Sequence, residues 1–183
     1  MFSTLTFVTG NPDKLREARQ ILGVELAQAD LRGLEEIQAV DVEAAIRHKA
    51  HEAYARLKAP LIVEDTGLAF MAWNGLPGAL VKWFLETVGN KGLLAMLAGF
   101  TDRRALAQCF IAYHDGAAVT VVKGEIAGTI ADDERGEGGF GWDRIFVPDG
   151  HTCTFAEMTA EEKNACSHRQ RAFEALRAYI NKR

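Results

Sequence analysis

Residues 61–67 read Leu-Ile-Val-Glu-Asp-Thr-Gly, a short apolar run followed at once by two acidic side chains. The apolar run predicts a buried strand over residues 61–63. Open α/β sheets bind their ligands beyond the carboxyl ends of the strands, so Glu64 and Asp65 are candidates for a functional site. Solvated loop acids are the alternative. The interpretation as a solvated loop acid is weaker for Asp65, because Thr66-Gly67 leads into more apolar chain.

Working outward from this stretch, helices and strands alternate along the chain. On the N-terminal side the pattern predicts a strand over 4–9, a helix from Pro12 that Asn11 caps and Gly23 ends, a short strand near 24–29, and a helix over 41–58. On the C-terminal side it predicts helix over 80–98 with a break at Gly89-Asn90, strands over 104–114, 118–130 and 144–147, a loop over 131–141, and a final helix that follows the capping box Thr159–Glu162 and runs to about Ile180. We interpret residues 1–183 as one α/β domain in which the two long strands form a second lobe.

Composition excludes several classes of protein. The chain has 183 residues, of which 48% are hydrophobic and 25% charged, so it has enough apolar residues for a sizeable core. The net charge of −4 and the lack of a basic block argue against binding to a nucleic acid polymer. No apolar run is long enough for a membrane span, and the N-terminus does not resemble a signal peptide. Three scattered cysteines are typical of reduced thiols, so we expect a cytoplasmic protein.

Two lysines stand where an anion is expected to bind. Thr9-Gly10-Asn11-Pro12-Asp13-Lys14 joins a predicted strand to a helix, and such a junction offers backbone N–H groups and a helix dipole to phosphate. An ordinary turn with a surface lysine is the alternative. Lys49 falls on the apolar face of the 41–58 helix, where it must pair with an acid, bind a ligand or snorkel. His48 and His51 fall on the polar side of that helix, and we expect them to be solvated and not metal ligands.

Two segments near the C-terminus add aromatic and charged groups. Gly138-Gly-Phe-Gly-Trp-Asp143 combines flexible backbone with Phe140 and Trp142, and either ring is suited to stack on a nucleobase. Alternatively, one of these two rings is buried in the core and anchors the loop there. In Lys163-Asn-Ala-Cys-Ser-His-Arg169, Arg169 projects onto the core stripe and needs a carboxylate, phosphate or carbonyl partner. For His168 taken alone, a satisfied core histidine is the favoured interpretation.

Together these motifs resemble the inosine triphosphate pyrophosphatase family, whose members hydrolyse noncanonical purine nucleoside triphosphates. The resemblance rests on Phe7–Asn11 with Lys14, Val63–Leu68, Gly75–Gly78, Phe140–Asp143 and Lys163–Arg169, which occur in family order. It implies an elongated, two-lobed α/β fold with a central mixed β-sheet flanked by helices and an active-site cleft between the lobes. It also implies a homodimer.

The resemblance assigns roles to individual residues. Asp65 is implied as the catalytic base and, with Glu36, as a ligand of Mg²⁺; Glu35 stands next to Glu36, so a slip of one residue would exchange them. The residues implied in substrate binding are Thr9, Gly10, Asn11, Lys14, Lys49, Phe140, Gly141, Trp142, Asp143, Lys163, His168 and Arg169.

The expected reaction converts ITP, dITP or XTP to the nucleoside monophosphate and pyrophosphate. Two alternatives stay open from the sequence. One is a related pyrophosphatase that acts on modified pyrimidine or methylated nucleotides, and the other is a nucleotide-binding sensor without hydrolytic activity. The paired acids favour an enzyme, because a pure binder gains little from a carboxylate placed to activate water.

Overall fold

The computed structural model describes residues 5–35, 37, 39 and 42–182, and a single mixed sheet runs through it. The strand order is β2-β1-β3-β5-β6-β7, with β4 paired to β3. β1 is parallel to β2 and β3, and the other pairs are antiparallel. The strands are β1 (Thr6–Val8), β2 (Ala27–Ala29), β3 (Leu61–Phe70), β4 (Pro77–Gly78), β5 (Arg104–His114), β6 (Val119–Ile130) and β7 (Phe146–Pro148).

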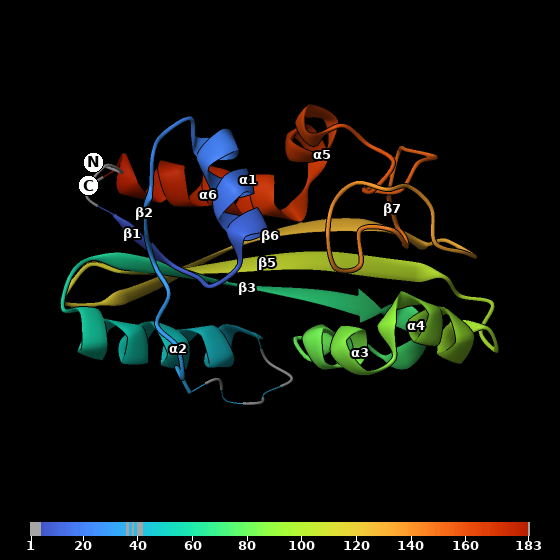
Figure 1. Ribbon diagram of the computed structural model, residues 1–183, viewed down its shortest axis with the longest axis horizontal. Helices are drawn as coiled ribbons and strands as arrows, with labels where there is room; N and C mark the ends of the chain where they lie inside the picture. Colours follow the sequence, from blue (N-terminus) through green and yellow to red (C-terminus); the bar gives the residue numbers. More distant parts are fainter. Residues whose placement is uncertain (1–4, 36, 38, 40–41, 183) are drawn as a thin grey trace.

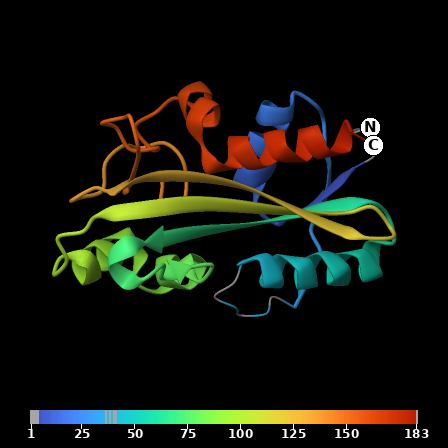
Figure 2. The same ribbon diagram turned by 180° about the vertical axis from the view of Figure 1, so that it is seen from behind.

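Helices cover both faces of this sheet. Figure 1 shows α1, α5 and α6 on one face and α2, α3 and α4 on the other, and Figure 2 shows the same two layers from behind. The molecule is elongated along β3, β5 and β6. The helices are α1 (Pro12–Leu22), α2 (Val42–Leu57), the 3₁₀ turn η2 (Met71–Trp73), α3 (Val81–Thr87), α4 (Gly89–Leu97), α5 (Ala160–Cys166) and α6 (His168–Ile180).

β3 is much longer than the strand predicted over 61–63. Every residue from Leu61 to Phe70 pairs with β5, so Glu64 and Asp65 lie within the strand and not after it. The sequence does not show this, because the pairing partner lies some forty residues further along the chain. β1, however, pairs with β3 only as far as Val63. The two acids therefore lie directly beyond the carboxyl end of their parallel neighbour, where ligands of α/β sheets bind.

The final helix is divided into α5 and α6, although the sequence pattern predicts one continuous helix. Ser167 is extended, with φ −77° and ψ 159°, and its hydroxyl accepts a hydrogen bond from the backbone N–H of Gln170. Serine is a favoured N-cap residue, so a new helix starts at His168. The predicted capping box at Thr159 and Glu162 is confirmed, as are the Asn11 cap and the left-handed Gly23 that ends α1.

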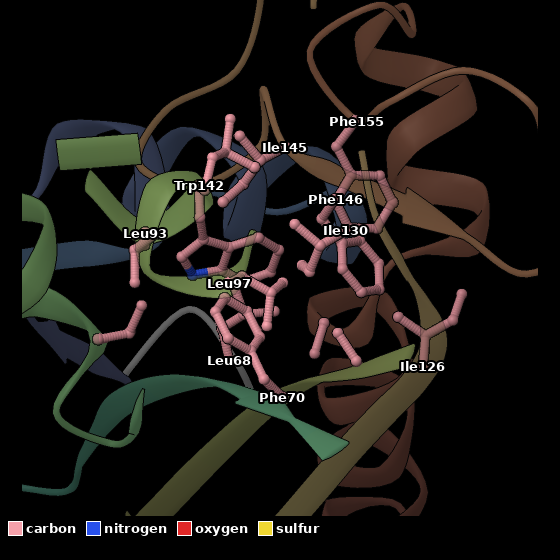
Figure 3. Packing of buried hydrophobic residues seen from close by; sticks show 14 of the residues in the cluster. Leu68, Phe70, Leu93, Leu97, Ile126, Ile130, Trp142, Ile145, Phe146 and Phe155 are labelled. Carbon is pink, nitrogen blue, oxygen red and sulfur yellow. The ribbon is translucent and has the colours of Figure 1, made fainter. Parts of the chain in front are cut away.

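The core consists of three apolar clusters, one at one end of the sheet and two at the other. At the first end, one cluster lies under α3, α4 and the 140–158 segment and includes Leu68, Leu93 and Trp142 (Figure 3). At the other end, one cluster lies under α1 and α6 and another under α2. β5 contributes to all three clusters. The sequence predicted that the two long strands form a lobe of their own, whereas in the structure they run through both ends of the molecule. In the described part of the chain, no helix combines the length and hydropathy of a transmembrane span.

We expect Gly124→Ala to destabilise the fold, because β6 and α6 touch through backbone at this glycine. A Cβ placed there would lie 2.2 Å from the carbonyl oxygen of His168 and 2.3 Å from the backbone nitrogen of Ala172. Forced overpacking of this kind costs about 2 kcal/mol. Urea unfolding followed by circular dichroism measures the change. Gly99→Ala is the matched control, because a Cβ at that residue meets nothing within 4 Å. Equal stability of the two variants would contradict the close approach.

Candidate active site

A cleft of about 680 Å³ opens where the two ends of the molecule meet. This volume suits a small-molecule ligand. Its walls come from the β1–α1 junction, described residues between Asp30 and Ala39, α2, β3, α3, the 140–143 loop and the start of α6. The predicted catalytic base Asp65 lines it, together with all but one of the residues predicted to bind substrate: Thr9, Gly10, Asn11, Lys14, Lys49, Phe140, Gly141, Trp142, Asp143, His168 and Arg169.

The β1–α1 junction turns the N-terminus of α1 toward the cleft. The Asn11 side chain accepts hydrogen bonds from the backbone N–H groups of Asp13 and Lys14, at 2.9 and 3.2 Å, and so fixes the first turn. The Asn11 N–H in turn donates to the Thr9 hydroxyl at 3.1 Å. The Lys14 ammonium reaches across to β3, where it lies 3.4 Å from Glu64 Oε1. This end of the cleft therefore joins a helix dipole and a lysine, which favours an anion.

Lys49 and Asp65 form an ion pair on the opposite wall. The Lys49 Nζ donates to Asp65 Oδ1 at 2.8 Å. Of the three outcomes that the sequence left open for Lys49, pairing with an acid is the one observed. The Asp65 side chain keeps 29% of its surface exposed, whereas the neighbouring Glu64 side chain has none. Asp65 is therefore the acid of β3 that a ligand or a water molecule can approach.

A buried network of charges lies beneath the cleft. The Arg169 guanidinium donates to both carboxylate oxygens of Glu64, at 3.0 and 2.8 Å, and also to Glu17 of α1. Lys163 of α5 donates to Glu17 at 2.8 Å and to Asp143 at 2.6 Å. All five side chains are buried. The expected partners of Arg169 are therefore carboxylates, and they come from the first helix and the third strand.

The network sets the charge state of its member Glu64 and of the adjacent residue His168. Burial alone would raise the pKa of Glu64, but the charges of Arg169 and Lys14 outweigh it and lower the pKa from 4.5 to about 2. At His168, burial and then the charges of Arg169 and Lys163 lower the pKa well below its usual value. His168 is thus a buried neutral imidazole, and neither of its ring nitrogens has a hydrogen-bond partner among the described residues. Such groups are rare, and two of them on the wall of a cleft point to a ligand.

The two aromatic residues of the glycine-rich loop have different environments. Trp142 is buried and packs against Phe146, Phe155 and His168, so it anchors the loop in the core. Phe140 is half-buried at the cleft, with the Lys163 Nζ 4.8 Å from its ring centroid. The Phe140 N–H donates to Asp143 Oδ2 at 2.7 Å. Asp143 therefore ties the loop to Lys163, while burial raises the pKa of its carboxyl group.

Some of the predicted residues lie elsewhere, and some important ones were not predicted. Lys163 does not line the cleft but lies behind it, paired with Glu17 and Asp143. Glu36 lies outside the described residues. Glu17 was missed, although its spacing from Lys14 and Ile21 places all three on one helix face. The sequence marks Glu64 as a functional-site candidate but does not show its pairing with Arg169. The wall formed by Leu80–Trp83 was also missed, because that segment carries no distinctive motif.

Comparisons with known proteins agree with this arrangement. Residues 5–179 match the model of the Ham1 family. The chain belongs to the Ham1 family. It is 47% identical over 182 residues to the inosine triphosphate pyrophosphatase of Yarrowia lipolytica, with 97% of this chain and 95% of that protein covered.

Solved structures of Ham1 family members show the same fold. A HAM1 protein from Coxiella burnetii superimposes with a TM-score of 0.85 at 29% identity, and the alignment covers 100% of each chain. A structure described as a nucleoside-triphosphatase and dITP/XTP pyrophosphatase, from Mycobacterium abscessus, gives a TM-score of 0.72 at 32% identity, with 94% and 97% covered. The mixed sheet flanked by helices is therefore the fold of this family.

We expect the stability of the metal-free protein to fall as the pH drops from about 4.5 toward 2. The pKa of Glu64 is lower in the folded protein than in the unfolded chain, so its ionised form stabilises the fold. This contribution is complete at pH values above 4.5 and is lost as the pH falls toward about 2. A shift of this size corresponds to about 3 kcal/mol. Urea unfolding across this pH range measures it. Glu64→Gln should be less stable at neutral pH and lose this part of the pH dependence, whereas the exposed Glu161→Gln should behave as wild type. An unchanged pH profile in Glu64→Gln would remove the carboxylate from this role.

Proposed function

We propose that this chain hydrolyses noncanonical purine nucleoside triphosphates to the monophosphate and pyrophosphate. One observation carries the proposal: an accessible carboxylate and two lysines share a single cleft with a buried, neutral histidine whose ring nitrogens have no hydrogen-bond partner among the described residues. The cations suit a polyphosphate, the carboxylate suits a water molecule, and the histidine suits a polar heterocycle. The names of the relatives, inosine triphosphate pyrophosphatase and dITP/XTP pyrophosphatase, support the same substrate class.

The phosphate end of the cleft is formed by Lys14, Lys49 and the first turn of α1. In the free protein Lys49 is paired with Asp65 at 2.8 Å. A triphosphate offers Lys49 a second anionic partner, which releases the Asp65 carboxylate to orient a water molecule and accept its proton. The water oxygen attacks the α phosphorus, the bond from that phosphorus to the α–β bridging oxygen breaks, and pyrophosphate leaves. The two lysines then stabilise the charge that develops on the phosphate oxygens.

The residues present fit a bound Mg²⁺. This ion prefers a few carboxylates together with water and substrate phosphates. Asp65 offers a partly exposed carboxylate on the cleft wall, and we propose that it holds the ion together with Glu36. When bound, Mg²⁺ would neutralise charge on the phosphate oxygens.

The base end of the cleft is formed by Phe140 and His168. The ring of Phe140 is suited to stack on a purine. The neutral His168 carries one ring N–H, and we propose that it donates to the 6-oxo group of hypoxanthine or xanthine. Adenine carries a 6-amino donor in that place, so the N–H of His168 would face a second donor and lose its hydrogen bond. A mismatch of buried polar groups discriminates strongly between substrates.

The assembly and the location of the protein stay expectations. We propose a homodimer in the cytoplasm, as the resemblance to the family implies. Large apolar side chains that are exposed in the single chain, such as Trp83 and Phe100, would gain from being covered.

We expect Asp65→Asn to lower turnover by about 10²- to 10⁴-fold, which is the range for loss of a general base. Inosine monophosphate and pyrophosphate released from ITP in the presence of Mg²⁺ are the quantities to measure. Asp132→Asn, at a fully exposed acid, serves as the control and should keep full activity. Near-normal turnover in Asp65→Asn would exclude Asp65 from the chemistry, and a wild-type protein that binds ITP without releasing product would identify a sensor.

We expect His168→Phe to reduce the preference for ITP over ATP. Phenylalanine retains the packing against Trp142 and Phe155 but removes both ring nitrogens. kcat/KM for ITP should fall at least about tenfold, with little change for ATP, because only the matched base loses hydrogen bonds. Arg169→Ala is also expected to blur the preference, but it breaks buried ion pairs and is the less clean test. An unchanged ratio of the two kcat/KM values in His168→Phe would show that His168 does not read the base.

A further inference from the structure

A histidine and two acids converge outside the cleft. Glu35 precedes α2, and His48 and Glu52 lie one turn apart on that helix. One ligand atom from each of the three side chains lies within 4.8 Å of the other two. None of the three residues lines the cleft described above. The cluster is therefore separate from the groups that would hold the nucleotide.

The imidazole of His48 is directed at the acids without being hydrogen-bonded to them. Its Nε2 atom is buried, has no hydrogen-bond partner among the described residues, and lies 3.6 Å from Glu35 Oε2. This distance is too long for a hydrogen bond. Two ligands of a tetrahedral Zn²⁺, each bound at about 2.1 Å, are separated by about 3.4 Å. The nitrogen and the oxygen thus already have the spacing that a shared metal ion requires.

Two further contacts hold the Glu52 carboxylate in place. The backbone N–H of Glu35 donates to Glu52 Oε2, which ties the loop to the helix. Arg56 pairs with the other oxygen, Glu52 Oε1. The position of the Glu52 carboxylate is therefore fixed before any metal arrives, and Arg56 offsets part of the negative charge that the two acids bring together.

We propose that Glu35, His48 and Glu52 form a binding site for a divalent transition metal ion of the Zn²⁺ class. An imidazole combined with carboxylates suits Zn²⁺, whereas Mg²⁺ prefers oxygen ligands alone. Three protein ligands leave the fourth tetrahedral position to water. His48 was expected to be solvated, because its position on the helix does not show that Glu35 lies across from it.

The site would connect the metal to one wall of the cleft. Leu34 and Ile37, on either side of Glu35 in the chain, line the cleft, as does Lys49 next to His48. A metal held between Glu35 and α2 would therefore fasten that wall to the helix. The proposal does not depend on the reaction proposed above, because it rests only on these three side chains.

Calorimetric titration of the full chain with ZnCl₂, in an excess of Mg²⁺, tests the proposal. Wild type should bind one equivalent, and His48→Gln should bind at least about tenfold more weakly, because it loses the imidazole ligand. His51→Gln is the matched control, since it removes an exposed histidine from the same helix outside the cluster. It should bind Zn²⁺ as wild type does. No binding by wild type, or equal loss in both variants, would overturn the proposal.

A second pair of variants separates this site from the cleft. Asp65→Asn removes the acid expected to hold Mg²⁺ and should leave Zn²⁺ affinity unchanged, whereas Glu35→Gln should weaken it as His48→Gln does. The visible absorption of bound Co²⁺ should have the intensity of a four-coordinate ion in wild type and lose it in His48→Gln. Zn²⁺ binding that disappears in Asp65→Asn and persists in His48→Gln would place the ion in the cleft and refute the proposed site.

Discussion

The buried guanidinium of Arg169 is the constraint on which the rest of the structure depends. It is only 1% exposed and is held between Glu64 of β3 and Glu17 of α1. A charge removed from water is tolerated only when well-placed partners surround it, and loss of one partner leaves a costly unpaired charge. The first helix, the third strand and the last helix must therefore dock together. Lys163 extends the same requirement to α5 and, through Asp143, to the glycine-rich loop.

The same network determines the chemistry available above it. Positive charges lower the pKa of Glu64 and outweigh the opposite effect of burial. At His168 the positive charges and burial act in the same direction and keep the imidazole neutral. A neutral imidazole both donates and accepts a hydrogen bond, whereas an imidazolium only donates. The ion pairs are thus more than a means of joining elements, because they decide what kind of ligand the inner end of the cleft can accept. A substitution in the network is expected to change both stability and selectivity.

Features encoded locally could be predicted from the sequence, whereas those that depend on distant pairing could not. The Asn11 cap and the Thr159 capping box depend on residues within one turn. Lys49 was recognised because a lysine within an apolar helix face needs a partner nearby. The length of β3 depends instead on β5, and the role of Glu17 depends on Arg169, 152 positions away. Glu36 lies outside the described residues, so its predicted role as a metal ligand stays a prediction.

The contrast between Glu64 and Asp65 follows from the geometry of a strand. Successive residues of a β-strand point to opposite faces of the sheet, so Glu64 meets Arg169 of α6 while Asp65 meets Lys49 of α2. One acid is enclosed as a structural partner, and its neighbour stays accessible for chemistry. Both still reach one cleft, because β1 pairs with β3 only as far as Val63, and β4 does not pair with β3 until Leu68. The early end of the short first strand therefore lets lysines from both sides of the sheet face the same ligand.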